Sequence, residues 1–276
     1  MTKLKNIKVV VTDLDGTLLN TQHRISDYTK SIFQELHNQN YLIVVATGRH
    51  HLDAMAIIDK LEIPVYLVSS NGARIHSPEK EELFAFNLDS DIVKAALNVE
   101  IDPEITVVLF KENVWQTNKI SEKLNAFQEK LNYRPELVDY KALEDFGAIK
   151  IFFSCDNHEK LVKLKDDILA NSSEHLHHAF SLPTCLEFMD KSIDKAVAIE
   201  TVLEKAGFTL AEAVSFGDGF NDVQMLSVSG KGLIMGNAPA LLKETLPNLE
   251  VIKTNAEDGV ARFIATRILD KEFAAS

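Results

Sequence analysis

The amino-acid sequence predicts an α/β protein with a parallel central sheet and a second, α+β domain inserted into it. Short apolar runs that end in small and polar residues recur along the chain, the first from Ile7 to Val11, and such runs are typical of strands buried on both faces of a parallel sheet. Between residues 87 and 187 the pattern changes to half-buried strands and helices without paired acids or Gly-rich turns. We therefore expect a core domain of residues 1–86 and 188–276 and an inserted domain of residues 87–187.

The composition is that of an ordinary soluble globular protein. The chain has 276 residues, of which 46% are hydrophobic and 25% are charged. Its net charge of -12 and the absence of a basic stripe argue against nucleic-acid binding. No apolar run approaches the roughly 18 residues of a membrane span, and the first residues lack the pattern of a signal peptide, so we expect a cytoplasmic protein that does not bind membranes. The sequence leaves the oligomeric state open.

The first apolar run leads directly into two acidic residues, Asp13 and Asp15. Ligands of open parallel sheets bind at the carboxyl ends of the strands, so both carboxylates can reach one crevice. Carboxylates that close repel each other unless a cation or a proton lies between them. The sequence therefore predicts a hard metal ion at this strand end, most simply Mg²⁺.

The run of residues 41–49 repeats this architecture and ends in groups suited to phosphate. Thr47 offers a hydroxyl group and Gly48 a backbone N–H where a helix is expected to begin. Arg49 could add a charge at the phosphate, but an ion pair with an acid of the core is the interpretation that we favour.

Two further segments of the first half have simple local predictions. Ser26 is placed to cap a helix whose apolar positions include Ile32, Phe33 and Leu36. A strand over residues 65–73 ends in Asn71-Gly72, which is first of all a tight-turn pattern.

The inserted domain is predicted to contain strands and helices but no second active site. Strands are expected at residues 105–110 and 148–155, and helices at 120–131 and 158–169. Three histidines, His175, His177 and His178, could bind a metal, but alternation along a strand sends them to opposite faces, so surface side chains are the favoured interpretation. Cys155 and Cys185 lack a metal-binding or redox spacing and are expected to be buried free thiols.

The core is predicted to return with a helix that carries a lysine in its first turn. Asp194 is placed near the helix cap, and the expected buried stripe is Val197, Ile199, Val202 and Leu203. Lys195 opposes the helix dipole there and needs an anionic partner.

A further strand runs into Gly217 and Asp218 and is followed by Asn221 and Asp222. Asp218 adds a third strand-end carboxylate, so a metal shell of Asp13, Asp218 and the backbone carbonyl of Asp15 is plausible. Asp222 is placed to hold Lys195 by an ion pair. Strands over residues 231–238 and 249–255 are expected to complete the sheet.

These motifs resemble those of the haloacid dehalogenase-like (HAD) phosphatases. The string DLDGT at residues 13–17, Thr47, Lys195 and GDGFND at residues 217–222 match the four motifs of that superfamily in order. The segments ATGRHH, SNGARIH, TCLEFM and GLIMGNAP are similar to Cof-type members, subfamily IIB, and most to enterobacterial phosphatases of pyridoxal phosphate and sugar phosphates. The resemblance implies a HAD-type, Rossmann-like core with an inserted C2B-type cap. Asp194 and Ala196 flank Lys195 where the Cof branch usually has Ser and Gly.

The resemblance also implies a mechanism with Mg²⁺ as cofactor and a small phosphorylated metabolite as substrate. Asp13 is expected to attack phosphorus and form an aspartyl phosphate, and Asp15 to act as general acid and then general base. The cap is expected to act as a lid over the strand ends. The resemblance assigns phosphate binding to Thr47, Gly48, Lys195, Asn221 and the backbone at Leu14, metal binding to Asp13, Asp15 and Asp218, and support of Lys195 to Asp222.

Two alternatives to a phosphatase stay open on the sequence alone. A sugar phosphomutase of the same superfamily also carries Asp at the position of Asp15. A catalytically idle module that binds phosphorylated ligands is disfavoured because every chemical position is filled. The ATP-driven pumps of the superfamily carry Thr at this position, and two-component receiver domains are about half as long with no inserted domain, so neither class fits.

Overall fold

The computed structural model describes residue 4 and residues 6–120, 135–171 and 176–271 of the chain. These residues fall into two compact units, which are described separately below. The core unit comprises Met1–Ala85 and Asp194–Ser276, and the inserted unit comprises Phe86–Ile193. The return to the core lies six residues later than the predicted boundary after residue 187, because strand β11 (Cys185–Asp190) still pairs with the sheet of the inserted unit.

The core unit is built on an eight-stranded sheet in the order β14-β13-β12-β1-β2-β3-β4-β5. The strands are β1 (Val9–Thr12), β2 (Leu42–Ala46), β3 (Tyr66–Ser69), β4 (Arg74–His76), β5 (Glu82–Ala85), β12 (Ala213–Gly217), β13 (Lys231–Ile234) and β14 (Glu250–Val251). Neighbouring strands from β14 to β3 are parallel, as predicted, whereas β4 and β5 add antiparallel.

The predicted third strand is shorter than expected, because the chain turns at Ser70, Asn71 and Gly72. These residues have φ angles of 49°, 56° and 111°. The predicted Asn-Gly turn is therefore present, and it reverses the chain into β4.

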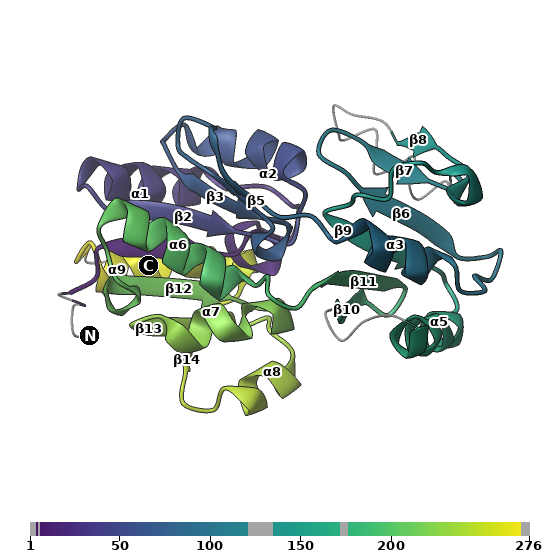
Figure 1. Cartoon of the computed structure of the whole chain (residues 1–276). Helices are drawn as coiled ribbons and strands as arrows, with labels where there is room; N and C mark the ends of the chain where they lie inside the picture. The colour runs from purple at the N-terminus through teal and green to yellow at the C-terminus, as the bar shows by residue number, and fades with distance from the viewer. Residues whose placement is uncertain (1–3, 5, 121–134, 172–175, 272–276) are drawn as a thin grey trace. The chain divides into compact units, whose positions relative to one another are not determined.

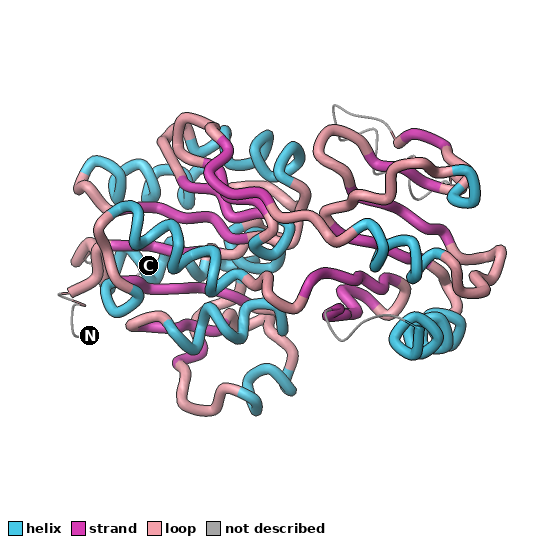
Figure 2. Tube along the Cα trace, viewed as in Figure 1, coloured by secondary structure: helices cyan, strands magenta, loops and turns pink. Residues whose placement is uncertain are grey.

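Helices cover both faces of the core sheet (Figures 1 and 2). The helices of this unit are α1 (Asp27–Asn38), α2 (His51–Ile58), α6 (Lys195–Ala206), α7 (Val223–Val228), α8 (Ala240–Thr245) and α9 (Gly259–Arg267). One face packs on α1, α2 and α9, and the other on α6 and α7. Because β1, β2 and β12 are parallel neighbours, the loops that follow them lie at one edge of the sheet.

The predicted capping residues are confirmed, but one predicted buried position is wrong. The Ser26 hydroxyl accepts a hydrogen bond from the backbone N–H of Thr29, and the Asp194 carboxylate accepts one from that of Val197. Val197 is 51% exposed, whereas the other three positions of its predicted stripe are buried. Val197 lies roughly 200° around the helix axis from Ile199, so both cannot face the sheet.

The inserted unit contains a six-stranded sheet in the order β10-β11-β9-β6-β7-β8. Its elements are α3 (Ser90–Leu97), β6 (Thr106–Phe110), β7 (Trp115–Thr117), β8 (Glu136–Leu137), β9 (Lys150–Ser154), α5 (His158–Asn171), β10 (Leu176–Leu182) and β11. Alternate residues of β6, β9 and β11 pack against α3 and α5, which gives the α+β architecture that the sequence predicts.

The remaining predictions for the inserted unit concern one helix, the histidines and the cysteines. The predicted helix over 120–131 lies almost wholly outside the described residues, as does His175. His177 is exposed and His178 half-buried on β10. Both cysteines are free, as predicted, although Cys185 is half-buried, not buried.

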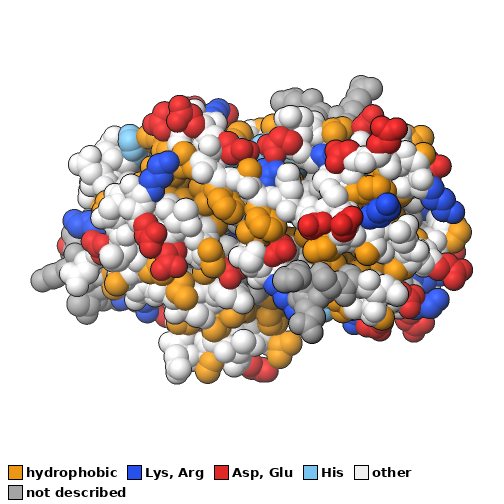
Figure 3. All heavy atoms as spheres, viewed as in Figure 1, with side chains coloured by type: hydrophobic (Ala, Val, Ile, Leu, Met, Phe, Trp, Pro, Cys, Tyr) orange, Lys and Arg blue, Asp and Glu red, His pale blue; other side chains and the backbone are white. Residues whose placement is uncertain are grey.

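Acidic and basic side chains are interspersed on the face that Figure 3 shows. With a net charge of -12, the overall field repels an anionic substrate, so attraction has to come from local groups. Within the described part of the chain, no helix is both long and apolar enough to span a membrane.

Candidate active site

The turn after β1 brings two acidic loops together. Asp13 is 6% exposed, and its backbone N–H donates to the carbonyl of Phe216 at the end of β12. The next residues, Leu14–Leu18, form one distorted helical turn in which Gly16 has a φ of 76°. A Cβ atom on Gly16 would lie 2.1 Å from a carboxylate oxygen of Asp218. The glycine of the first motif therefore permits both the turn and the close approach of Asp218.

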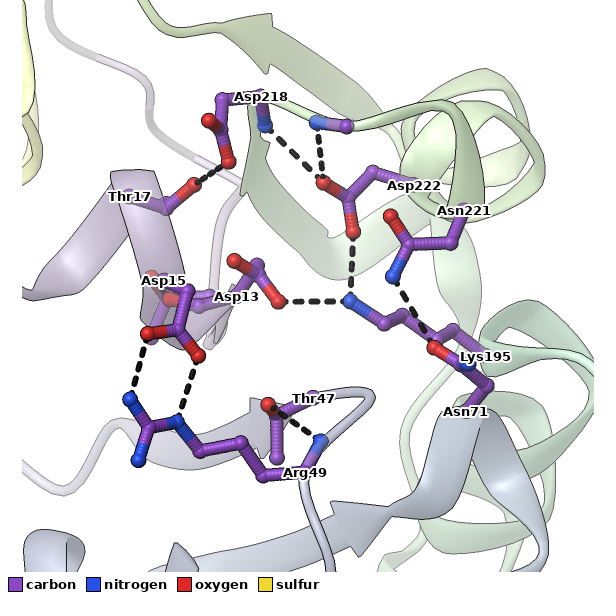
Figure 4. A network of polar contacts seen from close by, with 12 residues as sticks. Asp13, Asp15, Thr17, Thr47, Arg49, Asn71, Lys195, Asp218, Asn221 and Asp222 are labelled. Carbon is purple, nitrogen blue, oxygen red and sulfur yellow. Dashed lines mark hydrogen bonds and ion pairs between the residues drawn. The ribbon is translucent and has the colours of Figure 1, made fainter. Parts of the chain in front are cut away.

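Lys195 lies at the centre of the site (Figure 4). It is the first residue of α6 and is 1% exposed, and its ammonium group donates to Asp13 and to Asp222, each at 2.7 Å. The predicted ion pair with Asp222 is thus present. The second oxygen of Asp222 accepts from the backbone N–H groups of Asp218 and Gly219 at 3.0 and 2.9 Å, so Asp222 fixes both the lysine and the loop after β12.

Burial and repulsion by neighbouring carboxylates both raise the pKa values of Asp13 and Asp218. Burial raises the pKa of Asp13, and the charge of Lys195 opposes this rise. Burial and the charge of Asp222 raise the pKa of Asp218 to about 6. The ion pairs hold the pKa of Lys195 above its usual value despite burial, so the lysine is a permanent cation.

The acidic residues of the site have a donor set that fits a hard divalent cation. Oxygen atoms of Asp13, Asp218 and Asp222 lie within 4.8 Å of one another, and one lysine charge leaves three carboxylates undercompensated. Asp222 is 1% exposed and accepts from the lysine ammonium group and from two backbone N–H groups, whereas Asp218 accepts from two neutral side chains, so Asp13 and Asp218 are the better-placed ligands. The carboxylate of Asp15 faces Arg49, which leaves only its backbone carbonyl for the predicted metal shell.

Two side chains that the sequence analysis missed orient Asp218. The Thr17 hydroxyl donates to one carboxylate oxygen at 3.1 Å. The Asn237 amide donates to the other at 3.3 Å and to the carbonyl of Gly16 at 2.8 Å. Both residues belong to strings quoted for the resemblance, DLDGT and GLIMGNAP, and that was the signal available for them.

Arg49 forms the ion pair with an acid that the sequence analysis favoured, and its partner is Asp15. Its Nε and Nη2 atoms each donate to one oxygen of Asp15 at 2.6 Å, and Nη1 donates to Asp53 at 2.7 Å. Burial alone would raise the pKa of Asp15, but the hydrogen bonds and charge of Arg49 outweigh it and lower that pKa. The ion pair therefore favours the carboxylate form of Asp15.

The predicted phosphate-binding residues border the same strand ends. Thr47 follows β2 and is 1% exposed, and its hydroxyl accepts from the backbone N–H of Arg49 at 3.1 Å. The β3–β4 turn docks beside it, because the backbone N–H of Asn71 donates to the carbonyl of Thr47. Asn221 donates to the Asn71 side chain at 3.0 Å, and a Cβ atom on Gly48 would lie 3.1 Å from that side chain. Asn71, predicted first of all as part of a turn, thus also contacts two of the predicted site residues, Thr47 and Asn221.

A family model described as haloacid dehalogenase-like hydrolase matches residues 10–264. The chain belongs to this family. The HAD architecture predicted from the sequence is confirmed by a solved structure of a haloacid dehalogenase-like hydrolase from Bacteroides thetaiotaomicron, which superposes with a TM-score of 0.81 at 26% identity over 94% of this chain and 99% of that one.

Curated relatives of this HAD protein are named as phosphatases. A putative phosphatase of Buchnera aphidicola subsp. Baizongia pistaciae is 35% identical over 93% of this chain and 96% of its own length. The HMP-PP phosphatase of Cronobacter sakazakii is 33% identical over 91% of this chain and 92% of its own. The predicted enzyme class, a phosphatase, agrees with the HAD family and with these relatives.

Proposed function

We propose that this HAD protein hydrolyses phosphomonoesters of small metabolites by way of an aspartyl phosphate on Asp13. The observation that carries the proposal is the position of Asp13, buried at the end of β1, 2.7 Å from the ammonium group of Lys195 and grouped with Asp218. A carboxylate held beside a fixed cation can approach a phosphoryl group whose oxygens that cation stabilises.

The proposed first half-reaction forms a bond between a carboxylate oxygen of Asp13 and phosphorus as the bond to the leaving oxygen breaks. Lys195, the Thr47 hydroxyl, the amide of Asn221 and the backbone N–H groups at Leu14 and Gly48 bind the phosphoryl oxygens. The leaving oxygen takes a proton from the carboxyl group of Asp15. Because Arg49 favours ionised Asp15, this step draws on the less populated, protonated form of that residue.

The second half-reaction returns the site to its starting state. The Asp15 carboxylate takes a proton from water, the water oxygen bonds to phosphorus, and the bond between phosphorus and Asp13 breaks to release inorganic phosphate. The ion pair with Arg49 suits this step because it keeps Asp15 in the form that accepts a proton. When bound by Asp13, Asp218 and the carbonyl of Asp15, Mg²⁺ supplies positive charge that offsets the carboxylates and the phosphate.

Removal of divalent cations should abolish turnover. EDTA is expected to lower phosphate release by roughly 100-fold or more, and added Mg²⁺ to restore it, because one lysine cannot compensate three carboxylates and a phosphate. The Asp218→Asn variant should need more Mg²⁺ for half-maximal rate, since one proposed ligand becomes neutral. Full activity in the chelator, measured by phosphate release, would exclude the metal.

The substrate class is tested with a panel of phosphorylated metabolites. The sequence resemblance points to pyridoxal 5'-phosphate and sugar phosphates, and a relative's name adds HMP-PP. We expect Mg²⁺-dependent phosphate release from one or more members of a panel of pyridoxal 5'-phosphate, hexose and pentose phosphates, HMP-PP and a nucleotide, with Asp13→Asn as the blank. An isomerised sugar phosphate without phosphate release would identify a phosphomutase instead, and tight binding without any reaction would identify a binding module.

A further inference from the structure

Asp53 is a buried carboxylate to which the proposed reaction gives no task. It lies in the first turn of α2, four residues after Arg49, and is 7% exposed. One of its oxygens accepts from Nη1 of Arg49 at 2.7 Å. Burial of an acid is costly unless the charge is paired, so the fold retains Asp53 at this position through the ion pair.

Arg49 connects Asp53 to Asp15 through a planar group of fixed geometry. Two of its nitrogens donate to the two oxygens of Asp15, and a third donates to Asp53. A guanidinium group held by carboxylates at both ends keeps one orientation, because rotation at either end breaks hydrogen bonds to charged partners.

Asp15 needs such support, because its own surroundings restrain it weakly. Its side chain is 43% exposed and projects from a turn whose backbone at Asp15 and Gly16 is not helical. The imidazole of His23 lies 3.7 Å from the same carboxylate, but its side chain is 72% exposed. Figure 4 shows the Asp15 carboxylate directed at Arg49, while Asp13 points to Lys195. The bidentate contact with Arg49 is thus the dominant restraint on the Asp15 carboxylate.

We propose that Asp53 is a positioning residue that acts through Arg49 to hold the carboxyl group of Asp15 in the orientation from which it exchanges protons with the leaving oxygen and with water. The proposal rests on the proposed function, because it supposes that Asp15 is the general acid and base. Asp53 itself touches neither substrate nor reacting atoms. Loss of its charge frees Arg49 at one end and lets Asp15 take other rotamers.

A positioning role for Asp53 predicts an effect that depends on the leaving group. An alkoxide leaving group needs a proton from Asp15, whereas p-nitrophenolate leaves without one. The ratio kcat/KM reports the steps up to the first irreversible one, here cleavage of the ester bond, so later hydrolysis of the aspartyl phosphate does not enter it. A misplaced Asp15 therefore lowers kcat/KM for an alkyl ester far more than for the aryl ester.

The experiment compares Asp53→Asn with the wild type on p-nitrophenyl phosphate and on the best alkyl phosphate of the panel. We expect kcat/KM to fall about 10-fold for the alkyl ester and less than about 2-fold for the aryl ester, a part of the roughly 100-fold or larger effect of a general acid. Asp59→Asn is the matched control, because Asp59 forms an exposed ion pair with Lys80 in the same unit. Asp59→Asn removes the same charge and should leave kcat/KM unchanged for both esters.

Equal losses for both esters would show that Asp53 only supports the fold, and no loss for either would show that Arg49 needs no second anchor. Either result overturns the proposal.

If Asp53→Asn does not fold, as judged by circular dichroism, Arg49→Lys provides the test, because a single ammonium group keeps the charge but cannot hold both acids in a fork. Arg49→Lys should also lower kcat/KM more for the alkyl ester than for the aryl ester. Equal kcat/KM losses for the two esters in this variant would count against the proposal. A wild-type protein inactive on both esters would instead reject the proposed function.

Discussion

The Asp13→Asn variant should have no measurable phosphatase activity while keeping its fold. The amide has the shape of the carboxyl group but lacks the anionic oxygen that attacks phosphorus, so we expect a loss of roughly 10⁴-fold or more in kcat. Lys195 keeps its ion pair with Asp222 at 2.7 Å, which preserves the centre of the site. Phosphate release measures the first effect, and thermal unfolding followed by circular dichroism measures the second.

A matched substitution separates the role of the nucleophile from a loss of charge. Asp27 is exposed in the first turn of α1, and Asp27→Asn makes the same chemical change on the surface of the core unit. This variant should retain full activity. Substantial phosphate release by Asp13→Asn would remove the proposed nucleophile, and a phosphorylated protein trapped at another residue would show where the reaction occurs.

The parallel part of the core could be predicted because its strands are local features of the sequence. The run from Ile7 to Val11 and the run that opens at Tyr41 are nearly all apolar, and each ends in the polar residues that mark a strand end. The antiparallel hairpin of β4 and β5 had no such signal, since these strands have three and four residues and β5 is largely exposed. Their pairing depends on the backbone turn at Ser70–Gly72, whose positive φ angles only the structure shows.

Some residues of the site could also be predicted from the sequence, whereas others could not. Asp13, Lys195 and Asp222 could be predicted as a group because each belongs to a motif, and the structure joins them by ion pairs of 2.7 Å. Thr17 and Asn237 contact Asp218 across 201 and 19 residues of sequence, through the neighbouring strands β1, β12 and β13. The sequence around a single polar loop residue does not identify a partner on a neighbouring strand end.

Arg49 shows how far local reasoning reaches. A strand-end arginine next to an acidic site indicates an ion pair, and that prediction is confirmed. The identity of the partner was not predictable, because Asp15 lies 34 residues away on the neighbouring strand end. Asp53 lies four residues after Arg49, but Arg49 precedes the extended N-cap residue His50 of α2, so the helical i, i+4 rule does not apply and spacing alone could not predict this pair.

The Lys195→Met variant should lose both activity and stability, because a buried lysine charge compensates two buried carboxylates. The lysine side chain is fully buried, and its partners Asp13 and Asp222 have side chains only 8% and 1% exposed. Removal of one partner of a buried ion pair costs about 3–5 kcal/mol of unfolding free energy, because the remaining charges lose their compensation. Turnover should fall roughly 10³-fold or more, since the same cation stabilises the phosphoryl oxygens.

The stability loss of Lys195→Met should depend on pH in a defined direction. Without the lysine, burial and the charge of Asp222 raise the folded-state pKa of Asp13 further above its unfolded value, so the folded variant binds a proton more tightly than the unfolded chain. Protonation therefore stabilises the folded variant at low pH, and this contribution is lost as the pH rises through the raised pKa of Asp13. Urea unfolding at pH 5 and pH 8 should show a smaller difference from wild type at pH 5. Lys231→Met, which breaks an ion pair with the partly exposed Glu250, should cost less than about 1 kcal/mol at either pH. A deficit independent of pH would mean that Lys195 stabilises the fold by packing, and the charge balance proposed for the site would fail.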